Sequence, residues 1–362
     1  MKKINYGLIG CGMMAQEHVR NIALLPEARV AAVFDPVDDL ARQAAALAGG
    51  AEVMASFEAL LARDDLDALV IASPNFLHVP QLQQIAASAP RPVLVEKPLY
   101  TDPAQAAWVA EFAKTYPAPV WVAMEYRYMP PVAALIAQAE AATGGIRMFT
   151  IREHRFPFLP KIGDWNRFNA NTGGTLVEKC CHFFDLMRLV LRSDPVRVMA
   201  SAGQAVNHLD ETYDDRTPDI WDNAYVIVDF ANGARAMLEL CMFAEGSRYQ
   251  EEISAVGPTG KIEALVPGPG RFWPPHLGEP PTAQLIVSPR HPKGPEMREI
   301  PVDPALLAAG DHNGSTFYQH QKFAAVVRGE GTPEVTLHDG AMAVAIGLAA
   351  QESARTGQAV TL

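Results

Sequence analysis

Residues 4–15 read INYGLIGCGMMA and join a run of strand-forming residues to a glycine-rich turn. The pattern G-x-G-x-x-A starts at Gly10, directly after the predicted strand 4–9, and a helical stretch over residues 15–25 follows. Glycines in this pattern permit a tight turn and let a pyrophosphate approach the helix N-terminus closely. A second predicted strand, residues 30–34, completes a βαβ unit that is typical of dinucleotide binding.

Asp35 ends the second strand, about 20 residues past the turn, where an acidic side chain can bind the ribose 2′-hydroxyl. Its carboxylate would repel the 2′-phosphate of NADP, and residues 36–38 read PVD, with no Arg or Lys to hold that group. The alternative is a structural turn whose glycines occur by chance. We predict NAD as the cofactor, bound by Asp35 and by the turn residues Gly10, Gly12, Met13 and Met14.

Residues 93–99 read VLVEKPL and form a short apolar strand that ends in a charged pair. Three apolar residues without polar alternation favour a strand buried on both faces of a parallel sheet. Pro98 cannot donate to a strand ladder, so Glu96 and Lys97 should lie at the carboxyl end of this strand. Open α/β sheets bind ligands at that edge. A surface ion pair is the simpler alternative.

Strands and helices alternate through residues 1–124, which predicts a doubly wound parallel sheet of the Rossmann type and a NAD-binding domain. Ser73, Asn75 and His78 follow the predicted strand 68–72. They should lie at the same edge as the charged pair, within reach of the nicotinamide or the substrate. His78 could instead be a solvent-exposed histidine at a helix N-terminus.

The alternation breaks after residue 124, and residues 125–362 read as a second domain of the α+β class. Strand-like runs dominate its middle, and Asn232-Gly233 between two of them is a hairpin signal, so we expect an antiparallel sheet. Closing helices are predicted over 317–328 and 339–356, and they could pack back on the first domain. The predicted strands cover residues 147–154, 196–202, 224–230, 234–241, 251–256 and 285–287.

Residues 173–187 are predicted to form a helix with apolar residues on nearly every side, so this helix should be mostly buried. Glu178 and His182 share one face, and Asp185 lies one further turn along. Charged groups in a buried helix are costly unless they are paired or used, so a structural Glu–His pair competes with a catalytic one. Residues 180–182 (Cys-Cys-His) cannot converge on one ion, because consecutive helical residues point about 100° apart, and we predict no metal site.

Composition restricts the classes of function. The 362 residues are enough for two domains, and 49% hydrophobic and 20% charged residues are ordinary for a globular protein. A net charge of −11 argues against nucleic acids and anionic membranes as partners, and no run of about 18 apolar residues could span a bilayer. A strand follows Met1-Lys2-Lys3 too soon for a signal peptide, and the four cysteines show no disulfide framework. We expect a cytoplasmic protein that acts on a small molecule.

Taken together, these motifs resemble the Gfo/Idh/MocA family, the glucose–fructose oxidoreductase and inositol dehydrogenase type of sugar oxidoreductase. The resemblance covers essentially the whole chain. The glycine turn, the E-K-P sequence at 96–98, the S-P-N sequence at 73–75 with His78, and the closing VTLHDG at 335–340 are similar to family motifs. The family implies a Rossmann domain, a second domain with a large, mostly antiparallel open sheet, and homo-oligomers (dimers or tetramers) built through that sheet.

Glu178 and His182 match the acid-x-x-x-His motif that completes the Lys–Asp–His triad of this family, with Lys97 as the lysine. This chain departs from the family's usual Asp at Glu178, and it has Cys180-Cys181 where a glycine or aliphatic pair is common. Because Glu is one methylene longer, its carboxylate reaches the site if the helix sits slightly farther back. The departure bears on the substrate subtype and on the role of Glu178.

The expected chemistry is oxidation of a secondary hydroxyl, which needs a hydride acceptor, a base for the proton and positive charge near the developing alkoxide. NAD would accept the hydride. His182 would be the base, because its reference pKa of about 6.5 suits neutral pH. Lys97 would stabilise the alkoxide with Glu96 helping to fix it, and Glu178 would bind another hydroxyl or orient the Lys97–His182 pair. Either Lys97 or His182 could take the proton.

Polar and aromatic residues near the triad suit a polyhydroxylated ring, although each could equally be an ordinary surface residue. The predicted substrate-binding set is Lys97, Arg127, Tyr128, His154, Lys161, Asp164, Trp165, Asn166, Arg167, Glu178 and His182. Asp311, His312 and Asn313 form a weaker candidate cluster.

Three functions compete at this point. The first is a NAD-dependent dehydrogenase that oxidises a sugar, a sugar derivative or an inositol. The second is a glycosidase or lyase that retains NAD and uses transient oxidation to break a bond. The third is a non-catalytic sensor that binds nucleotide and sugar. The complete set of Lys97, Glu178 and His182 weighs against the sensor.

Overall fold

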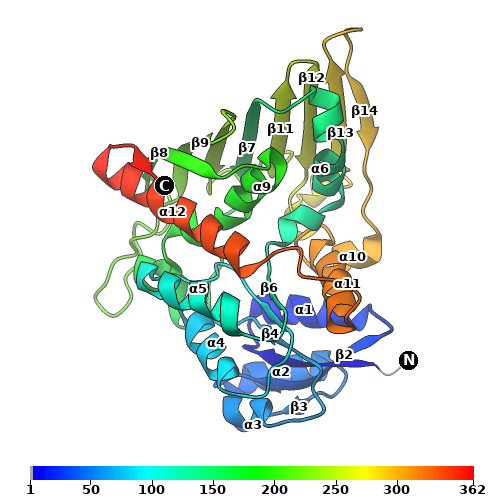
Figure 1. Cartoon of the computed structure of the whole chain (residues 1–362), viewed down its shortest axis with the longest axis vertical. Coiled ribbons are helices and arrows are strands. Elements are labelled where there is room, and N and C mark those ends of the chain that lie inside the picture. Colours follow the sequence, from blue (N-terminus) through cyan, green and yellow to red (C-terminus); the bar gives the residue numbers. More distant parts are fainter. Residues whose placement is uncertain (1–2) are drawn as a thin grey trace.

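The computed structural model describes residues 3–362 and contains two sheets at opposite ends of the molecule (Figure 1). The first has six strands in the order β3-β2-β1-β4-β5-β6, and its neighbouring strands are parallel. This order confirms the predicted doubly wound Rossmann sheet. The strands are β1 (Ile4–Ile9), β2 (Ala28–Phe34), β3 (Glu52–Val53), β4 (Ala68–Ile71), β5 (Val93–Val95) and β6 (Val120–Val122).

Every residue of β1, β4, β5 and β6 is buried. Strands of a parallel sheet with helices on both faces are apolar along their whole length, which is why these segments show no polar alternation in the sequence. The connecting helices are α1 (Met13–Ala23), α2 (Asp38–Leu47), α3 (Phe57–Leu61), α4 (His78–Ala86) and α5 (Ala106–Thr115).

The second sheet has nine strands in the order β14-β13-β12-β11-β7-β10-β9-β8-β15. Across residues 3–362 its neighbours are antiparallel, except that β7 and β10 run parallel. The predicted large, mostly antiparallel sheet is therefore confirmed. Its strands are β7 (Met148–His154), β8 (Pro195–Gly203), β9 (Asn223–Phe230), β10 (Arg235–Cys241), β11 (Glu251–Gly257), β12 (Gly260–Val266), β13 (Gln284–Pro289), β14 (Glu296–Glu299) and β15 (Val360–Thr361).

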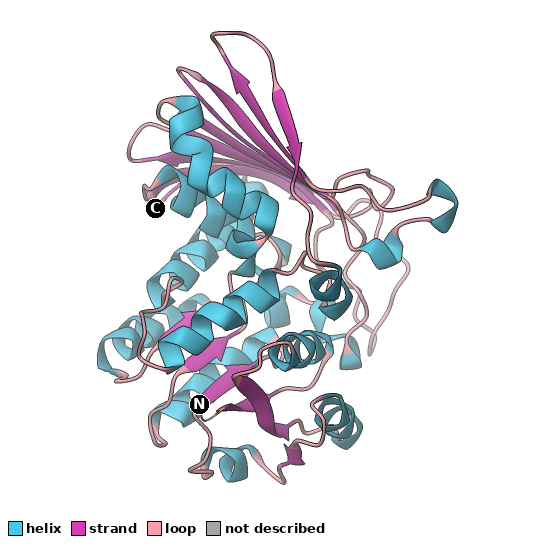
Figure 2. Cartoon of the chain, turned by 90° about the vertical axis from the view of Figure 1, so that its right-hand side faces the viewer, coloured by secondary structure: helices cyan, strands magenta, loops and turns pink. Residues whose placement is uncertain are grey.

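Three helices cover one face of this sheet. They are α6 (Pro130–Thr143), α9 (Cys181–Leu191) and α12 (Leu337–Thr356), which pack against β12, β7 and β8 respectively. Figure 2 shows no helix over the other face of the described sheet. Side chains alternate accordingly: Phe149 and Ile151 of β7 are buried, whereas Met148 of β7 and Tyr225 of β9 are exposed. We call the uncovered side the open face.

The end of the chain returns to the six-stranded sheet. α11 (Ser315–Val327) packs against α1, and α12 packs against α5 and β6 as well as β8. A capping box between Thr336 and Asp339 fixes the start of α12. The closing helices thus join the two sheets and bring the segment before α11 beside the glycine turn.

The remaining helices are short. They are α7 (Asn169–Thr172), α8 (Thr175–Glu178) and α10 (Pro304–Ala309), together with 3-10 helices at Asn75–Leu77, Pro103–Gln105, Glu125–Tyr128, Ile162–Arg167, Gly270–Phe272 and Pro275–Leu277. In the part of the chain that the structure describes, no helix is both long and apolar enough to cross a membrane.

Candidate active site

A cavity of about 970 Å³ lies at the carboxyl edge of the six-stranded sheet, where α1 begins and β5 ends. This is the edge at which doubly wound sheets bind ligands, and the volume suits a small organic molecule. Elements of both halves of the chain form its walls. They are the first turns of α1, Lys97, the loop after β7, the junction of α8 and α9, and the segments 267–283 and 300–313.

The turn between β1 and α1 fits a pyrophosphate. Gly10 has a φ of +83°, and a Cβ there would lie 2.6 Å from the backbone nitrogen of Ser73, so only glycine is tolerated. A Cβ on Gly12 would meet no described atom within 4 Å, so the space in front of α1 is open. No side chain caps α1 and its first turn holds no acid. Its amide groups are therefore available to phosphate oxygens.

Asp35 braces the same turn. Its Oδ2 accepts a hydrogen bond from the backbone N–H of Cys11 at 2.7 Å, and its Oδ1 accepts one from the N–H of Val37 at 2.8 Å. The side chain remains partly exposed at the end of β2. An anion held in this position can receive ribose hydroxyls and disfavours a phosphate.

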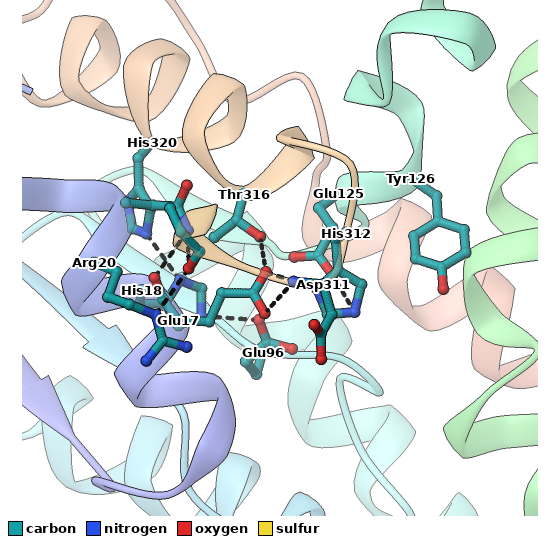
Figure 3. Close-up of polar contacts among 12 residues, drawn as sticks. Glu17, His18, Arg20, Glu96, Glu125, Tyr126, Asp311, His312, Thr316 and His320 are labelled. Atoms are coloured by element: carbon teal, nitrogen blue, oxygen red, sulfur yellow. Dashed lines mark hydrogen bonds and ion pairs between the residues drawn. The ribbon is translucent and has the colours of Figure 1, made fainter. Parts of the chain in front are cut away.

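Glu96 does not line the cavity. It belongs to a buried chain of polar contacts with His18 and His320 (Figure 3). Its Oε1 lies 3.0 Å from Nε2 of His18, and Nδ1 of His18 lies 2.8 Å from Nε2 of His320. Burial opposes ionisation of Glu96, but the hydrogen bond and charge of His18 lower its pKa. Oε2 of Glu96 also accepts from the backbone N–H of Lys97 at 3.2 Å. Glu96 thus supports the strand end from below.

Lys97 brings its ammonium group into the cavity, where Nζ donates to the backbone carbonyl of Glu178 at 3.3 Å. Burial alone would lower the pKa of Lys97, but the nearby Cys181, Glu96 and Glu178 outweigh burial and raise it. Lys97 is therefore positively charged at neutral pH. A fixed cation of this kind can stabilise a developing alkoxide.

The helix predicted over residues 173–187 is interrupted, which corrects the sequence-based expectation. α8 ends at Glu178 and α9 begins at Cys181. An unbroken helix would direct the carbonyl of Glu178 to an N–H four residues on, whereas here it accepts the Lys97 ammonium group. The predicted burial is correct, because Glu178 is 6% exposed and His182 is 2% exposed.

Glu178 and His182 each carry a buried polar atom without a protein partner. Oε2 of Glu178 and Nδ1 of His182 make no hydrogen bond within residues 3–362. The alternative of a structural Glu–His pair is therefore not realised. Burial raises the pKa of Glu178, although Lys97 and Lys161 oppose the rise. Since buried polar atoms are normally paired, these two atoms are suited to bind a ligand.

The imidazole of His182 stacks on the ring of Tyr126, with centroids 4.1 Å apart and planes 11° apart. Lys179 donates from Nζ to the Tyr126 hydroxyl at 2.6 Å and so holds this ring in place. Burial, reinforced by the charges of Lys97 and Lys179, lowers the pKa of His182 well below its usual value. The expectation that His182 titrates near neutrality is therefore wrong. Its imidazole is therefore neutral at physiological pH.

A second charged cluster brings the segment before α11 to the cavity (Figure 3). Oε1 of Glu17 lies 2.7 Å from Nδ1 of His312 and accepts from the hydroxyl of Thr316 at 2.9 Å, while Oε2 accepts from the N–H of Asp311 at 3.1 Å. A Cβ on Gly310 would lie 2.3 Å from Cδ of Glu17, so glycine permits this approach. The weaker candidate cluster of the sequence thus lines the cavity.

Glu125 lies behind His312 and is fully buried. Oε1 of Glu125 is 3.8 Å from Nε2 of His312, and neither carboxylate oxygen makes a hydrogen bond within the described residues. Burial raises the pKa of Glu125 to about 7 despite the opposing charge of His312. A carboxyl group next to the cavity therefore changes charge near neutral pH.

The position of His78 differs from both interpretations of this residue that the sequence allowed. It is fully buried, with Nδ1 2.8 Å from the carbonyl oxygen of Pro98 and Nε2 3.1 Å from that of Ser73. It therefore bridges two loops at the sheet edge, and it lies neither in solvent nor in the cavity. Asn75 is also buried, and its Nδ2 makes no hydrogen bond within residues 3–362.

Arg127 and Tyr128 do not line the cavity. The guanidinium group of Arg127 forms a buried, two-bond ion pair with Asp185, with Nε 2.5 Å from Oδ2. This pair accounts for the acid in α9 that sequence analysis left unassigned. The ring of Tyr128 packs 6.1 Å from that of Trp121. Both side chains are buried away from the cavity, Arg127 against Asp185 and Tyr128 against Trp121.

The predicted substrate-binding residues on β7 and in the loop after it differ in position. Lys161 and Asn166 line the cavity, whereas His154, Asp164, Trp165 and Arg167 do not. Arg167 binds Glu211 at 2.9 Å, and the ring of Trp165 meets Phe76 edge-on. Asp164 adopts a left-handed turn conformation, with a φ of +48°. His154 lies on β7, with Nε2 3.0 Å from Oε1 of Glu239 on the open face.

Several residues that line the cavity were not predicted from the sequence. Tyr126 directly precedes Arg127 and Tyr128, which were predicted. The strand-end rule that identified Lys97 also applies to Tyr126, because Tyr126 follows β6. The aromatic wall consists of Tyr126, Phe156 and Phe158 in place of Trp165. No signal in the sequence links Arg155 or Lys179 to the site. In residues 3–362, no group of three His, Cys, Asp or Glu side chains is placed to hold a metal ion.

Comparison with known families agrees with this architecture. The domain described as "Oxidoreductase family, NAD-binding Rossmann fold" matches residues 4–124, and the domain described as "Oxidoreductase family, C-terminal alpha/beta domain" matches residues 140–362. The chain belongs to the Gfo/Idh/MocA oxidoreductase family. The resemblance seen in the sequence is confirmed, and the cofactor of this oxidoreductase is NAD.

Individual relatives match most of the length of this oxidoreductase. It is 28% identical over 262 residues to the inositol 2-dehydrogenase of Rhizobium meliloti (strain 1021). The aligned residues cover 72% of this chain and 75% of that protein. It is 26% identical over 277 residues to the rhizopine catabolism protein MocA of Rhizobium meliloti, covering 76% and 81%. The structure of a levoglucosan dehydrogenase with NADH and levoglucosan superposes with a TM-score of 0.82 at 21% identity, over 99% of both chains.

Proposed function

We propose that this oxidoreductase oxidises a secondary hydroxyl of a sugar, a sugar derivative or an inositol by hydride transfer to NAD. The observation that carries the proposal is the convergence of Lys97, Glu178 and His182 on one cavity that also reaches the start of α1. The relatives named for inositol and levoglucosan support a polyhydroxylated substrate.

The three side chains divide the work between them. NAD supplies the hydride acceptor when it is bound. His182 takes the hydroxyl proton, because its lowered pKa keeps the imidazole neutral and its Nδ1 has no protein partner within residues 3–362. Lys97 stays protonated and donates to the same oxygen, where negative charge develops. Glu178 accepts from a second substrate hydroxyl through its unpaired Oε2.

The two halves of the chain have separate tasks in this proposal. Residues 1–124 bind NAD, and residues 125–362 bind the substrate and form a cytoplasmic homo-oligomer through the open face, without a nucleic-acid or membrane partner. Exposed Tyr225 and Ile227 on that face support the contact. Light scattering should give a molar mass that is a multiple of the 39.3 kDa chain, and Tyr225→Glu should lower it.

The reaction is tested by mixing the protein with NAD+ and a panel of sugars, sugar acids and inositols while NADH absorbance is followed. NADH should accumulate with at least one compound, and Lys97→Met should lower kcat by roughly 10²-fold or more while NAD+ binding by calorimetry persists. Lys114→Met, an exposed lysine on α5, is the matched control. Release of a leaving group without net NADH would instead indicate a lyase, and binding without either reaction would indicate a sensor.

A further inference from the structure

Lys161 is a cavity-lining cation without a protein partner. It belongs to the loop after β7 and is half-buried, and its ammonium group makes no hydrogen bond or ion pair within residues 3–362. Burial lowers its pKa, and the carboxylate of Glu178 opposes that effect most strongly among its neighbours. Lys161 and Glu178 line the same cavity. A partly buried ammonium group gains from pairing with an anion.

Arg155 lines the same part of the cavity and is also poorly paired. Its guanidinium group lies over the ring of Phe156 at 4.4 Å, and its Nε donates to the carbonyl of that residue at 3.1 Å. The nearest carboxylate is Oε1 of Glu153, 3.9 Å from Nη1, but Nζ of Lys179 already holds that oxygen at 2.8 Å. The terminal nitrogens of Arg155 thus have capacity for another acceptor.

The acids of the cavity do not offset these cations. Glu17 is taken by His312, and Asp311 is taken by Arg271 at 2.5 Å. Glu279 is exposed at the rim. That leaves Glu178, which forms no ion pair within residues 3–362, as the acid that shares the cavity with Lys97, Lys161 and Arg155.

The cations nearest the catalytic residues show the same excess. Lys179 is paired with Glu153 and His312 is paired with Glu17, whereas Lys97 forms no ion pair within residues 3–362 and Arg155 has only the 3.9 Å contact with Glu153. A neutral polyol needs positive charge only where the alkoxide develops, and Lys97 supplies it. The further cations indicate a negative charge elsewhere on the ligand.

We propose that the substrate is an anionic polyol, a sugar or cyclitol derivative whose carboxylate or phosphate group is bound by Lys161 and Arg155. This inference rests on the proposed function and names its substrate class. The pyrophosphate of the cofactor does not account for these cations, because it belongs at the uncapped start of α1, whereas Lys161 and Arg155 come from the loop after β7 in the other half of the chain. Arginine and lysine are the usual partners of both anionic groups.

The test compares substrates that differ in one group. Glucose, glucuronate and glucose 6-phosphate share a ring and differ at the terminal carbon, as do galactose and galacturonate. With NAD+ in excess, kcat/KM should be roughly 10- to 100-fold higher for one anionic member of a set, as expected for charge-assisted hydrogen bonds. A preference for the uronates identifies a carboxylate, and a preference for the phosphate ester identifies a phosphate.

Two variants test whether Lys161, in the loop after β7, causes the preference for an anionic substrate. Lys161→Met keeps the length of the side chain and removes its charge, so it should raise KM for the anionic substrate far more than it lowers kcat, and it should collapse the anionic-to-neutral ratio. Lys161→Arg keeps the charge and should retain most of the ratio. Lys114→Met is the matched control, and its ratio should equal that of the wild type.

The outcomes separate this inference from the proposed function. If neutral polyols are oxidised as well as their anionic partners, or if the ratio survives Lys161→Met, the inference is overturned and the dehydrogenase remains. If no polyol is oxidised, the proposed function fails, and calorimetry with the NADH-loaded protein decides the anion site on its own. Tighter binding of glucuronate or glucose 6-phosphate than of glucose, lost in Lys161→Met, supports the site, whereas equal or absent binding overturns it.

Discussion

Nδ1 of His312 lies 2.7 Å from Oε1 of Glu17, and this contact joins the helix after the glycine turn to the segment before α11 (Figure 3). Burial would raise the pKa of Glu17, but His312 lowers it to about 2. Burial would lower the pKa of His312, but Glu17 and Glu125 raise it to about 9. At neutral pH the two side chains therefore form an ion pair that ties the cavity wall to α1.

Glu17→Gln should lower the free energy of unfolding by roughly 1 to 3 kcal/mol near pH 6. The folded pKa of His312 exceeds its unfolded value of 6.5, so its contribution is complete below that pH and is lost as pH rises through about 9. The folded pKa of Glu17 is below its unfolded value of 4.5, so its contribution is present above that pH and is lost as pH falls toward about 2. Thermal unfolding near pH 6 and near pH 10 measures the difference, which should shrink at the higher pH.

Glu111→Gln, which changes an exposed acid on α5, is the control for this experiment and should barely alter the unfolding temperature at either pH. A deficit of Glu17→Gln that is equally large at both pH values would contradict the ion pair and point to lost packing alone.

His182→Asn should lower kcat for oxidation by roughly 10²- to 10⁴-fold, because the amide cannot take a proton. A base works in its unprotonated form, and the pKa of His182 is well below its usual value. Protonation of His182 should therefore lower the wild-type kcat/KM only at acid pH. The variant has no such group, so its kcat/KM should not show that decrease. His276→Asn, on an exposed 3-10 turn, should leave the whole profile unchanged.

A limb of the pH profile near neutrality should come from Glu125, whose pKa burial raises to about 7. Glu125→Gln should remove that limb while His182→Asn leaves its position unchanged. Profiles of kcat/KM for both variants decide between the two residues. A neutral limb that survives in Glu125→Gln and vanishes in His182→Asn would make His182 the titrating group after all.

Gly10→Ala and Gly12→Ala should separate folding from cofactor binding. A Cβ on Gly10 meets the backbone near Ser73 in a left-handed conformation, so this variant should lose roughly 1 to 3 kcal/mol of stability. A Cβ on Gly12 meets no described atom, so that variant should unfold at nearly the wild-type temperature. Its methyl group should nevertheless weaken NAD binding by roughly tenfold or more, measured by calorimetry. Unaltered NAD affinity in Gly12→Ala would argue against a pyrophosphate at this turn.

Asp35→Asn should narrow the preference for NAD+ over NADP+ by roughly tenfold or more, because it removes the charge that repels a 2′-phosphate. Asp35→Ala should in addition weaken binding of both cofactors, since the N–H groups of Cys11 and Val37 lose their acceptors. Values of kcat/KM for the two cofactors measure both effects. A wild-type protein that prefers NADP+ would refute this role of Asp35.

The six-stranded sheet could be predicted because the physical rule for its strands is simple. β1, β4 and β5 are buried on both faces, so each is a short apolar run that ends at a turn. The same rule places Lys97 at the carboxyl edge of the sheet, where ligands bind, before its hydrogen-bond partners are known. In the nine-stranded sheet, the inner strand β12 and the edge strand β14 were not predicted. In β12 the partly exposed Lys261 and Glu263 break the apolar run, and β14 is exposed along its whole length.

The site could be predicted only where one local pattern decides a residue's position. Glu178 and His182 were found by their spacing, but the break after α8 was not, because no Gly or Pro marks residues 179–180. Arg127 and His78 are polar residues beside the site whose partners, Asp185 and Pro98, come from other elements. Such contacts depend on how elements pack, and a pattern along one segment does not contain that information.

The anchor of Lys97 is the peptide carbonyl of residue 178, a group that every amino acid provides. Mutation can therefore exchange the side chain at this position for one that suits another substrate without releasing the lysine. Because α8 and α9 are interrupted at this point, the side chain at position 178 is free to vary during evolution while the contact that positions the lysine is kept.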